Sequence, residues 1–283
     1  MSKQTTSWEW EITPKTNWLG TSLQELGNYR DLLWQMVRKN FALYYQQTLL
    51  GPLWMVINPI LTVLVYTFIF NRVIGISTNG VPPIAFYLVG ITLWTLFLDI
   101  FNGTSNIFTQ NAYLFSKVYF PRLIIPLSSV LLHLLRFSIQ LMILLIVLLY
   151  MHISGELQLS PLQMMYAIPV IVIMTSIALG SGLIVSVVTA KYKDISNLVG
   201  LFTRLLFFIC PIFYSVSIVP NNMGWIVAMN PMASLFEIFR FAFVGAGHFD
   251  GLQVLYSGSV ALVLLFTGVM IYNKQGDRLI DVI

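Results

Sequence analysis

The chain has 283 residues, of which 57% are hydrophobic and 9% are charged. A soluble domain carries roughly 25% charged residues, so the composition excludes an ordinary soluble protein and predicts an integral membrane protein. Lys and Arg number 15 against 11 Asp and Glu, a formal net charge of +4 that is typical of cytoplasmic loops and excludes a nucleic-acid-binding surface. The single cysteine, Cys210, excludes an internal disulfide or a cysteine-based metal cluster.

Two different regions precede the first apolar stretch. Residues 1–22 form a polar tail that lacks the apolar core of a signal peptide. Over residues 23–45, apolar side chains recur at helical spacing with polar side chains between them, which predicts an amphipathic helix at the cytoplasmic surface of a membrane. Such a helix is either a generic membrane anchor or a docking platform for a cytosolic partner.

A membrane crossing needs about 20 mainly apolar residues, and six segments within residues 46–283 meet this requirement. They run from about Leu53 to Ile74, Ile84 to Phe108, Leu123 to Met151, Leu162 to Thr189, Ile195 to Val216 and Gly251 to Asn273. The predicted fold is therefore an all-α integral membrane domain with six transmembrane helices.

Residues 217–250, between spans five and six, are too apolar for a free loop and are broken by Pro220, Asn230–Pro231 and Gly245–Gly247. Irregular backbone at membrane depth is tolerated only where protein or water satisfies it. We therefore predict a re-entrant helical pair here. The alternative is an amphipathic loop that lies on the membrane face.

The basic residues predict the orientation, because Lys and Arg are enriched in cytoplasmic loops. Arg72 and Arg240 alone fall outside when both termini are placed inside. The cytoplasmic set then comprises Lys3, Lys15, Arg30, Arg38, Lys39, Lys117, Arg122, Lys191, Lys193, Lys274 and Arg278. Both termini are therefore predicted to be cytoplasmic.

No sequence motif for catalysis or nucleotide binding is present. The chain has no GxxxxGK[ST] phosphate loop and no HExxH, CxxC or GxSxG motif. Its histidines, His133, His152 and His248, are scattered along the chain. We expect neither a metal nor a cofactor in this chain and no enzymatic activity, so any energy source must belong to another polypeptide.

Three ionisable residues, Asp99, Arg136 and Arg204, lie inside predicted spans. At 1.5 Å per residue, Asp99 lies about 8 Å, Arg204 about 10 Å and Arg136 about 20 Å from the cytoplasmic boundary. An unpaired charge in the membrane costs at least about 2.5–3.5 kcal/mol, and these depths allow a pair between Asp99 and Arg204. Snorkelling and local contacts between helices are the alternatives for all three.

Aromatic side chains gather in spans one, two and five. Sugar rings present C–H faces that stack on aromatic rings, which makes these residues candidates for a glycan channel. The channel candidates are Phe68, Phe70, Phe207, Phe208, Phe213 and Tyr214. Ordinary packing and interfacial aromatic belts are the alternative explanation.

The segment Tyr45–Pro59, YQQTLLGPLWMVINP, resembles the start of the first span in type-2 ABC transporter permeases that export O-antigen, capsule or teichoic acid. YRDLLW at Tyr29–Trp34, KVYFPRLIIP at Lys117–Pro126 and the final DVI are similar to the same family. Leu43–Tyr44 departs from the family, because many members carry a basic pair there. The resemblance covers nearly the whole chain.

This resemblance implies a homodimeric permease in the bacterial inner membrane, with each copy paired to a separate cytosolic ATPase subunit that binds ATP and Mg. It implies export of a lipid-linked glycan, with O-antigen on undecaprenyl pyrophosphate favoured over capsule or teichoic acid, and an outward gate at residues 217–250. The implied ATPase contacts are Tyr29, Arg30, Asp31, Asn111 and Lys117. Arg30, Arg38 and Lys39 would bind the lipid pyrophosphate, or anionic membrane lipids in general.

Two other classes of protein were weighed against this one. A membrane enzyme acting on polyprenyl-linked sugars should carry clustered acidic or His residues at the membrane surface, and the sequence lacks such a cluster. A permease for a drug or another small substrate is the second class. The aromatic content and the GPLW motif favour a polymer over a small substrate.

Overall fold

The computed structural model describes residues 27–46, 48–117, 120–192, 194–220, 222, 224–247 and 249–280. Over these residues the regular structure is helical, without a strand. The polar tail 1–22, residues 23–26 of the predicted amphipathic helix, Lys193, His248 and the final DVI lie outside the described residues.

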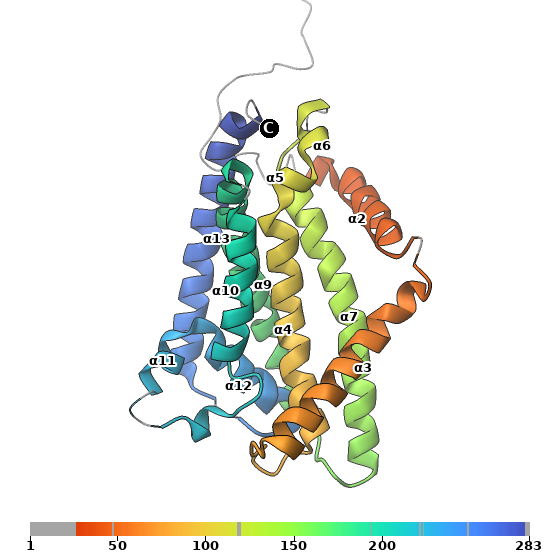
Figure 1. Ribbon diagram of the computed structural model, residues 1–283, viewed down its shortest axis with the longest axis vertical. Helices are drawn as coiled ribbons and strands as arrows, with labels where there is room; N and C mark the ends of the chain where they lie inside the picture. The colour runs from red at the N-terminus through yellow and green to blue at the C-terminus, as the bar shows by residue number, and fades with distance from the viewer. Residues whose placement is uncertain are drawn as a thin grey trace, which may run out of the picture.

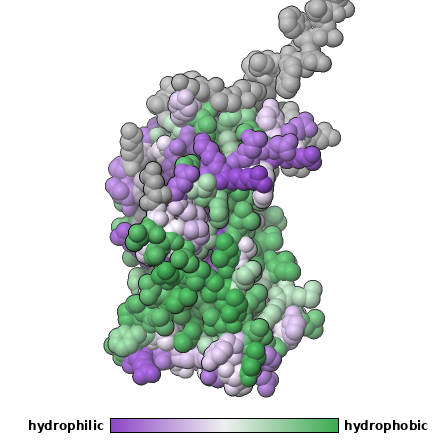
Figure 2. Space-filling model, turned by 90° about the vertical axis from the view of Figure 1, so that its right-hand side faces the viewer, coloured by the Kyte–Doolittle hydropathy of each residue, from purple (hydrophilic) through white to green (hydrophobic). Residues whose placement is uncertain are grey.

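Five helices in the described part are long and apolar enough to span a membrane. The first covers η1 (Gly51–Leu53), α3 (Trp54–Tyr66) and η2 (Thr67–Val73), and the others are α4 (Pro83–Ser105), α7 (Ile124–Ile153), α8 (Pro161–Met164) with α9 (Ala167–Lys191), and α13 (Gly251–Ile280). Figure 2 shows a broad apolar band on one face, with hydrophilic residues above and below it. These helices match five of the six predicted spans to within a few residues.

The helix of the fifth predicted span is shorter than expected. This helix, α10, has 15 residues and ends at Ile209, whereas the prediction continued to Val216. Cys210 is followed by Pro211, and a proline ring disfavours the helical conformation of the residue before it. Cys210 accordingly has an extended backbone with a ψ of 140°. Apolar side chains beyond Ile209 misled the prediction.

The segment after α10 contains two helices, and their re-entrant course stays a prediction. They are α11 (Gly224–Met229) and α12 (Pro231–Val244), preceded by the short η3 (Val216–Ile218). The Asn230 side chain caps α12 by accepting a hydrogen bond from the Met232 amide at 3.0 Å, and Gly245 ends it with a left-handed φ of 68°. Arg240, which the count of basic residues places on the outer side, lies within α12 and is 1% exposed.

The core of the protein surrounds α4, which is apolar on nearly every side and therefore suited to the interior. Helices α3, α7, α9 and α12 pack against it (Figure 1). Helix α9 makes its most extensive contact with α13. Gly180 of α9 and Gly268 of α13 bring the two backbones together, so that a Cβ at either glycine would overlap the other helix.

Helix α2 (Arg30–Tyr45) is amphipathic and lies against α7 (Figure 1). Tyr29, Leu32 and Leu33, at its start, pack against a small apolar cluster that contains Ile107 and Phe108 of α5 (Ile107–Gln110). The short helix α6 (Ala112–Lys117) follows α5. The start of α2 and the loop helix α5 therefore share one core, separate from the core around α4.

Candidate substrate cavity

An open cavity of about 800 Å³ lies between α3, α4 and α10, beside the end of α2 and one face of α7. Each of the three main helices turns one face toward it, because the lining residues recur at three- and four-residue spacing. Helix α4 contributes Ile91, Trp94, Thr95, Leu98, Asp99 and Asn102, and α10 contributes Gly200, Thr203, Arg204, Phe207 and Phe208. Helix α3 contributes Trp54, Met55, Asn58, Pro59, Thr62 and Tyr66, and α2 and α7 contribute Tyr44, Tyr45, Arg136 and Gln140.

The cavity has an aromatic part and a charged part. In the aromatic part, the ring centroid of Phe207 lies 5.3 Å from that of Trp94 and 5.9 Å from that of Tyr66. In the charged part, Arg136 meets Asp99, and the Arg136 guanidinium lies 4.1 Å from the centroid of the Tyr44 ring. Stacking surfaces and ionised groups therefore share one cavity inside an apolar protein.

Asp99 pairs with Arg136, and the pair with Arg204 that the depth count allowed is not formed. The Arg136 Nη1 lies 3.4 Å from the Asp99 Oδ2, and the His133 Nδ1 lies 3.9 Å from the same oxygen. The depth count failed because it assumed that all spans begin at one level. The 3.4 Å contact puts the two side chains at one level, although the count placed the residues about 12 Å apart in depth.

Arg204 lines the cavity from α10, on the side opposite α7. Within the described residues its side chain forms no ion pair or hydrogen bond. The charged side chains that line the cavity are thus two arginines and one aspartate. Their sum is positive, so this part of the cavity favours an anion.

Two tyrosines from the end of α2 complete the charged part. Tyr44 provides the aromatic face over Arg136, with a 4.1 Å separation that is typical of a cation–π contact. Burial raises the pKa of the Tyr45 hydroxyl above its ordinary value, against the opposite effect of the neighbouring Arg136. The hydroxyl therefore stays protonated at neutral pH and is available as a hydrogen-bond donor.

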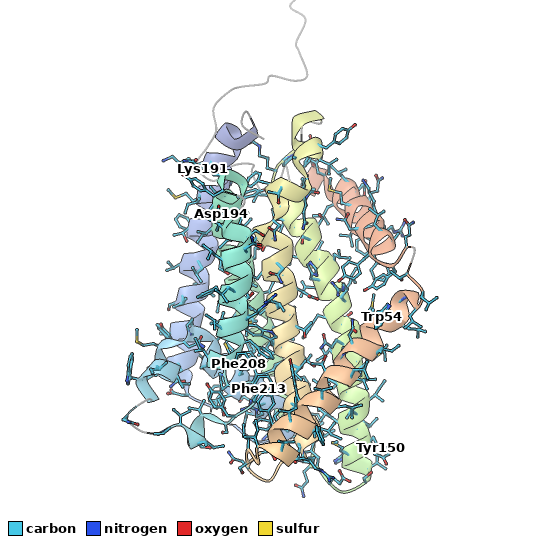
Figure 3. The ribbon with its side chains drawn as sticks, in the orientation of Figure 1. Trp54, Tyr150, Lys191, Asp194, Phe208 and Phe213 are labelled. Carbon is cyan, nitrogen blue, oxygen red and sulfur yellow. The ribbon has the colours of Figure 1, made fainter. Side chains whose placement is uncertain are left out.

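The six predicted channel aromatics divide into different environments. Phe207 and Phe208 line the cavity, whereas Phe213 is 3% exposed and stacks on Phe70 with centroids 4.1 Å apart. Phe68 is 62% exposed outside the cavity. Tyr214 donates a 2.7 Å hydrogen bond to the carbonyl oxygen of Ile209. Figure 3 shows Phe208 and Phe213 close together where α10 ends.

Sequence reasoning overlooked several aromatic and polar residues of the cavity wall. Trp54 and Tyr66 on α3, Tyr44 and Tyr45 on α2, and Gln140 on α7 are among them. Figure 3 places Trp54 at the start of α3, below α2. The available signal was the helical spacing of these residues with their neighbours, since Gln140 follows Arg136 by four residues on an otherwise apolar helix.

The predicted ATPase contacts lie at the end of the molecule that carries α2, α5 and α6. Arg30 and Asp31 are exposed and 3.9 Å apart, and Tyr29 is partly buried against the apolar cluster of α5. The Asn111 side chain donates a 3.1 Å hydrogen bond to the carbonyl oxygen of Ile107 and so stabilises the turn between α5 and α6. Lys117 ends α6, and its side chain lies outside the described part of the structure.

The two other basic residues predicted to meet phosphate, Arg38 and Lys39, are exposed on α2. Arg38 lies 5.9 Å from the ring centroid of Trp34, which is exposed on the same helix. Neither residue lines the cavity. The structure therefore separates these surface cations from the arginines of the cavity.

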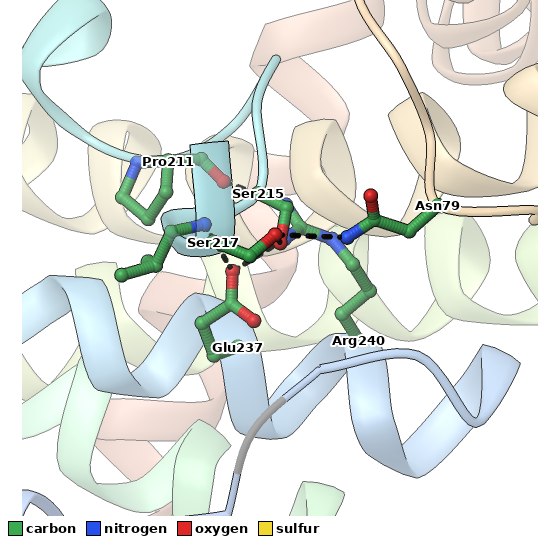
Figure 4. A network of polar contacts seen from close by, with 7 residues as sticks. Asn79, Pro211, Ser215, Ser217, Glu237 and Arg240 are labelled. Atoms are coloured by element: carbon green, nitrogen blue, oxygen red, sulfur yellow. Dashed lines mark hydrogen bonds and ion pairs between the residues drawn. The ribbon is translucent and has the colours of Figure 1, made fainter. Parts of the chain in front are cut away.

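A second charged pair, overlooked in the sequence, lies in α12 (Figure 4). The Arg240 Nη1 donates to the Glu237 Oε1 at 2.7 Å, and both side chains are buried. Asn79 and Ser217 extend the network through a 3.1 Å hydrogen bond. The signal in the sequence was a glutamate three residues before an arginine within an apolar helix, which indicates an intrahelical pair.

The family model for ABC-2 type transporters matches residues 31–244. The chain belongs to the ABC-2 type transporter family. This segment contains the lining residues of the cavity and the buried pair of α12. The resemblance inferred from the sequence motifs is therefore confirmed, and the ABC-2 chain is a multi-pass membrane protein of a transport family.

Similar proteins are known from several bacteria. The O-antigen export system permease protein RfbA of Klebsiella pneumoniae is 29% identical over 261 residues, which cover 91% of this ABC-2 chain and 97% of that protein. RfbA of Myxococcus xanthus is 26% identical over 260 residues, which cover 90% and 96%. The polysialic acid transport protein KpsM of Escherichia coli is 23% identical over 234 residues, which cover 82% and 88%.

Proposed function

We propose that this chain is the permease subunit of an ABC exporter that moves a lipid-linked polysaccharide across the bacterial inner membrane. The cavity with its aromatic and charged parts carries the proposal, because it offers stacking faces for sugars beside positive charge for a phosphate-bearing carrier. The relatives named for O-antigen export are more similar to this chain than the one named for polysialic acid transport. O-antigen on undecaprenyl pyrophosphate is therefore the favoured substrate over a capsule or teichoic acid polymer.

In the proposed topology, α10 is the fifth of six spans, and both termini are cytoplasmic. Its 15 residues give about 22 Å of helix, which is less than the roughly 30 Å of a hydrocarbon core. The α11–α12 pair, as a re-entrant outward gate, would cover the remaining thickness. Two copies, joined through the exposed apolar faces of α3 and α10, would close their cavities into one channel.

In this proposal, transport is driven by a separate ATPase subunit that binds ATP and Mg, with one such subunit for each copy of the permease. Arg30 and Asp31 would meet it directly, together with Asn111 and Lys117 in the loop of α5 and α6. Tyr29 would transmit the contact, because it packs on the same apolar cluster as Phe108 of α5. A displacement of α2 or of α5 by the ATPase would therefore move both helices together.

The exposed basic residues of α2 have a separate proposed role. Arg30, Arg38 and Lys39 would lie at the level of the lipid headgroups and attract the pyrophosphate of the carrier or other anionic lipids. Each basic residue near such a surface contributes about 1 kcal/mol of attraction. This contribution gathers the substrate near the cavity without selecting its sugars.

The decisive experiment is co-purification of this chain with the ATPase encoded beside it, followed by glycan export into vesicles driven by ATP. The variant Asp31→Lys should lower ATPase binding, because it reverses an exposed charge while leaving the fold intact. Asp194→Lys, a reversal at an exposed position distant from α2 in Figure 3, serves as the matched control. Export driven by an ion gradient without an ATPase would refute the proposal.

A further inference from the structure

Three buried donors in the charged part of the cavity have no hydrogen-bond partner among the described residues. They are the Tyr45 hydroxyl, the Arg136 Nε and the Gln140 Nε2. Gln140 is only 6% exposed. A buried donor without a partner costs about 1–3 kcal/mol, and three such donors at one cavity wall indicate that a ligand supplies the acceptors.

The threonine hydroxyls of the cavity wall already donate to carbonyl oxygens of their own helices. Thr62 donates to the carbonyl oxygen of Asn58 at 2.7 Å, and Thr95 donates to that of Ile91 at 2.8 Å. Thr203 likewise contacts carbonyl oxygens of its own helix, at 3.0 and 3.1 Å. The buried lining donors without a partner are therefore the three at Tyr45, Arg136 and Gln140.

The charges select the kind of ligand. Arg136 and Arg204 exceed the single carboxylate of Asp99, so the wall carries a net positive charge. Asp99 takes the Nη1 side of the Arg136 guanidinium at 3.4 Å and leaves its Nε without a partner. A neutral sugar needs no such excess charge, whereas a phosphate group offers several negatively charged acceptor oxygens to an arginine fork.

We propose that Arg136, Gln140 and Tyr45 form a binding site for a phosphate-bearing group within the cavity, with Arg204 facing it from α10. The site rests on the proposed function only for the source of its ligand, which is the diphosphate of a lipid-linked glycan. Asp99 competes with the ligand for Arg136 and so limits the affinity, because a transported group must be released as well as bound.

The site is distinct from the cations on the surface of α2. Arg38 and Lys39 are exposed and lie outside the cavity, whereas Arg136 is 17% exposed and held between Asp99 and Tyr44. A carrier would therefore meet the surface cations first and this site second. Entry into the second site would move the phosphate from the headgroup layer into the protein.

The test measures the binding of three probes to the full-length chain in lipid nanodiscs by equilibrium dialysis. The probes are geranylgeranyl diphosphate, geranylgeraniol and inorganic pyrophosphate. Gln140→Leu should weaken diphosphate binding roughly tenfold while the melting temperature stays unchanged or rises, because the leucine leaves no buried donor unpaired. Arg136→Gln should weaken it at least as much. Ser138→Ala is the control, since Ser138 is exposed on the same helix and donates to the carbonyl oxygen of Leu135.

The outcomes test three things separately: whether the site exists, which part of the ligand it recognises, and whether the protein exports a glycan. Equal binding of geranylgeraniol and its diphosphate, or unchanged binding in both Gln140→Leu and Arg136→Gln, would overturn the proposal. Pyrophosphate that binds as tightly as the lipid diphosphate supports the site and assigns recognition to the phosphate alone; tighter binding of the lipid supports it with a contribution from the chain. A protein that binds diphosphate but exports no glycan with its ATPase would refute the export function and leave this site standing.

Discussion

Arg240 donates a hydrogen bond of 2.6 Å to the carbonyl oxygen of Pro211, at the point where the chain leaves α10. Its partner Glu237 accepts a 3.2 Å hydrogen bond from the Val216 amide on the far side of the same irregular stretch. The guanidinium also lies 4.0 Å from the ring centroid of Phe86 on α4. The α12 pair thus satisfies backbone groups that the early end of α10 leaves without helical partners.

Removing one member of this pair should destabilise the protein strongly. Arg240→Met leaves the Glu237 carboxylate buried without its counterion, so we expect a loss of about 3–5 kcal/mol, measured as thermal unfolding of the purified chain in detergent. The double variant Glu237→Gln with Arg240→Met should recover part of this loss, because no bare charge remains. Arg72→Met, at an exposed position, should change stability by less than about 0.5 kcal/mol. If Arg240→Met unfolds at the same temperature as the wild-type protein, the stabilising role of the pair is contradicted.

Charge exchange identifies the partner of Asp99. Asp99→Arg alone places two cations side by side at Arg136, and we expect less folded protein as judged by size-exclusion chromatography. Adding Arg136→Asp should restore part of the yield, since the two atoms of the native pair are 3.4 Å apart. Adding Arg204→Asp instead should restore none. Equal rescue by both second changes would show that the field of the cavity matters and the specific pair does not.

The contact between α9 and α13 depends on residues without side chains. Gly180→Ala or Gly268→Ala inserts a methyl group against the backbone of the facing helix, and we expect each to cost at least about 1–3 kcal/mol. Gly258 is also in α13, but no atom lies within 4 Å of the position that its Cβ would take. Gly258→Ala should therefore stabilise the helix by roughly 0.5–1 kcal/mol. Differential scanning fluorimetry of the three variants tests this contrast.

Substitutions at Phe213 and Phe208 should distinguish a ring that stabilises the fold from a ring that contacts the substrate. Phe213 is 3% exposed among other rings, so Phe213→Ala should cost about 3–5 kcal/mol of stability. Phe208 is 62% exposed at the cavity, and Phe208→Ala should leave the melting temperature nearly unchanged while lowering the rate of glycan export into vesicles. An export rate equal to wild type in Phe208→Ala would remove this ring from the transport path.

Much of the fold was predictable from the length of apolar segments, because a membrane span must satisfy its own backbone as a helix. The helical pair after α10 was also predictable, since Asn230 with a following proline and Gly245 are start and stop signals. The end of α10 was predictable in principle from Pro211, but apolar side chains on both sides of it concealed the stop. Hydropathy counts side chains and does not detect backbone breaks.

The cavity was less predictable, because its wall combines residues from five helices. Asp99 and Arg136 were found as charges in apolar segments, but their pairing depends on the relative levels of α4 and α7. For Phe70 and Phe213, a sequence cannot distinguish a ring that lines a channel from one that packs against another ring. Gln140 carried a signal that we undervalued, since a buried amide in an apolar span requires a partner.

The helices differ widely in how much of each is buried within one chain. Sixteen residues of α4 are buried, whereas α3 buries only Val63 and α10 buries only Thr203 within one chain. The glycine contact between α9 and α13 resists sliding, because two touching backbones have no side chains to rearrange. Displacing α3 or α10 disrupts far less apolar packing within one chain than displacing α4 does. A conformational change that widens the cavity would therefore move these two helices relative to α4, α9 and α13.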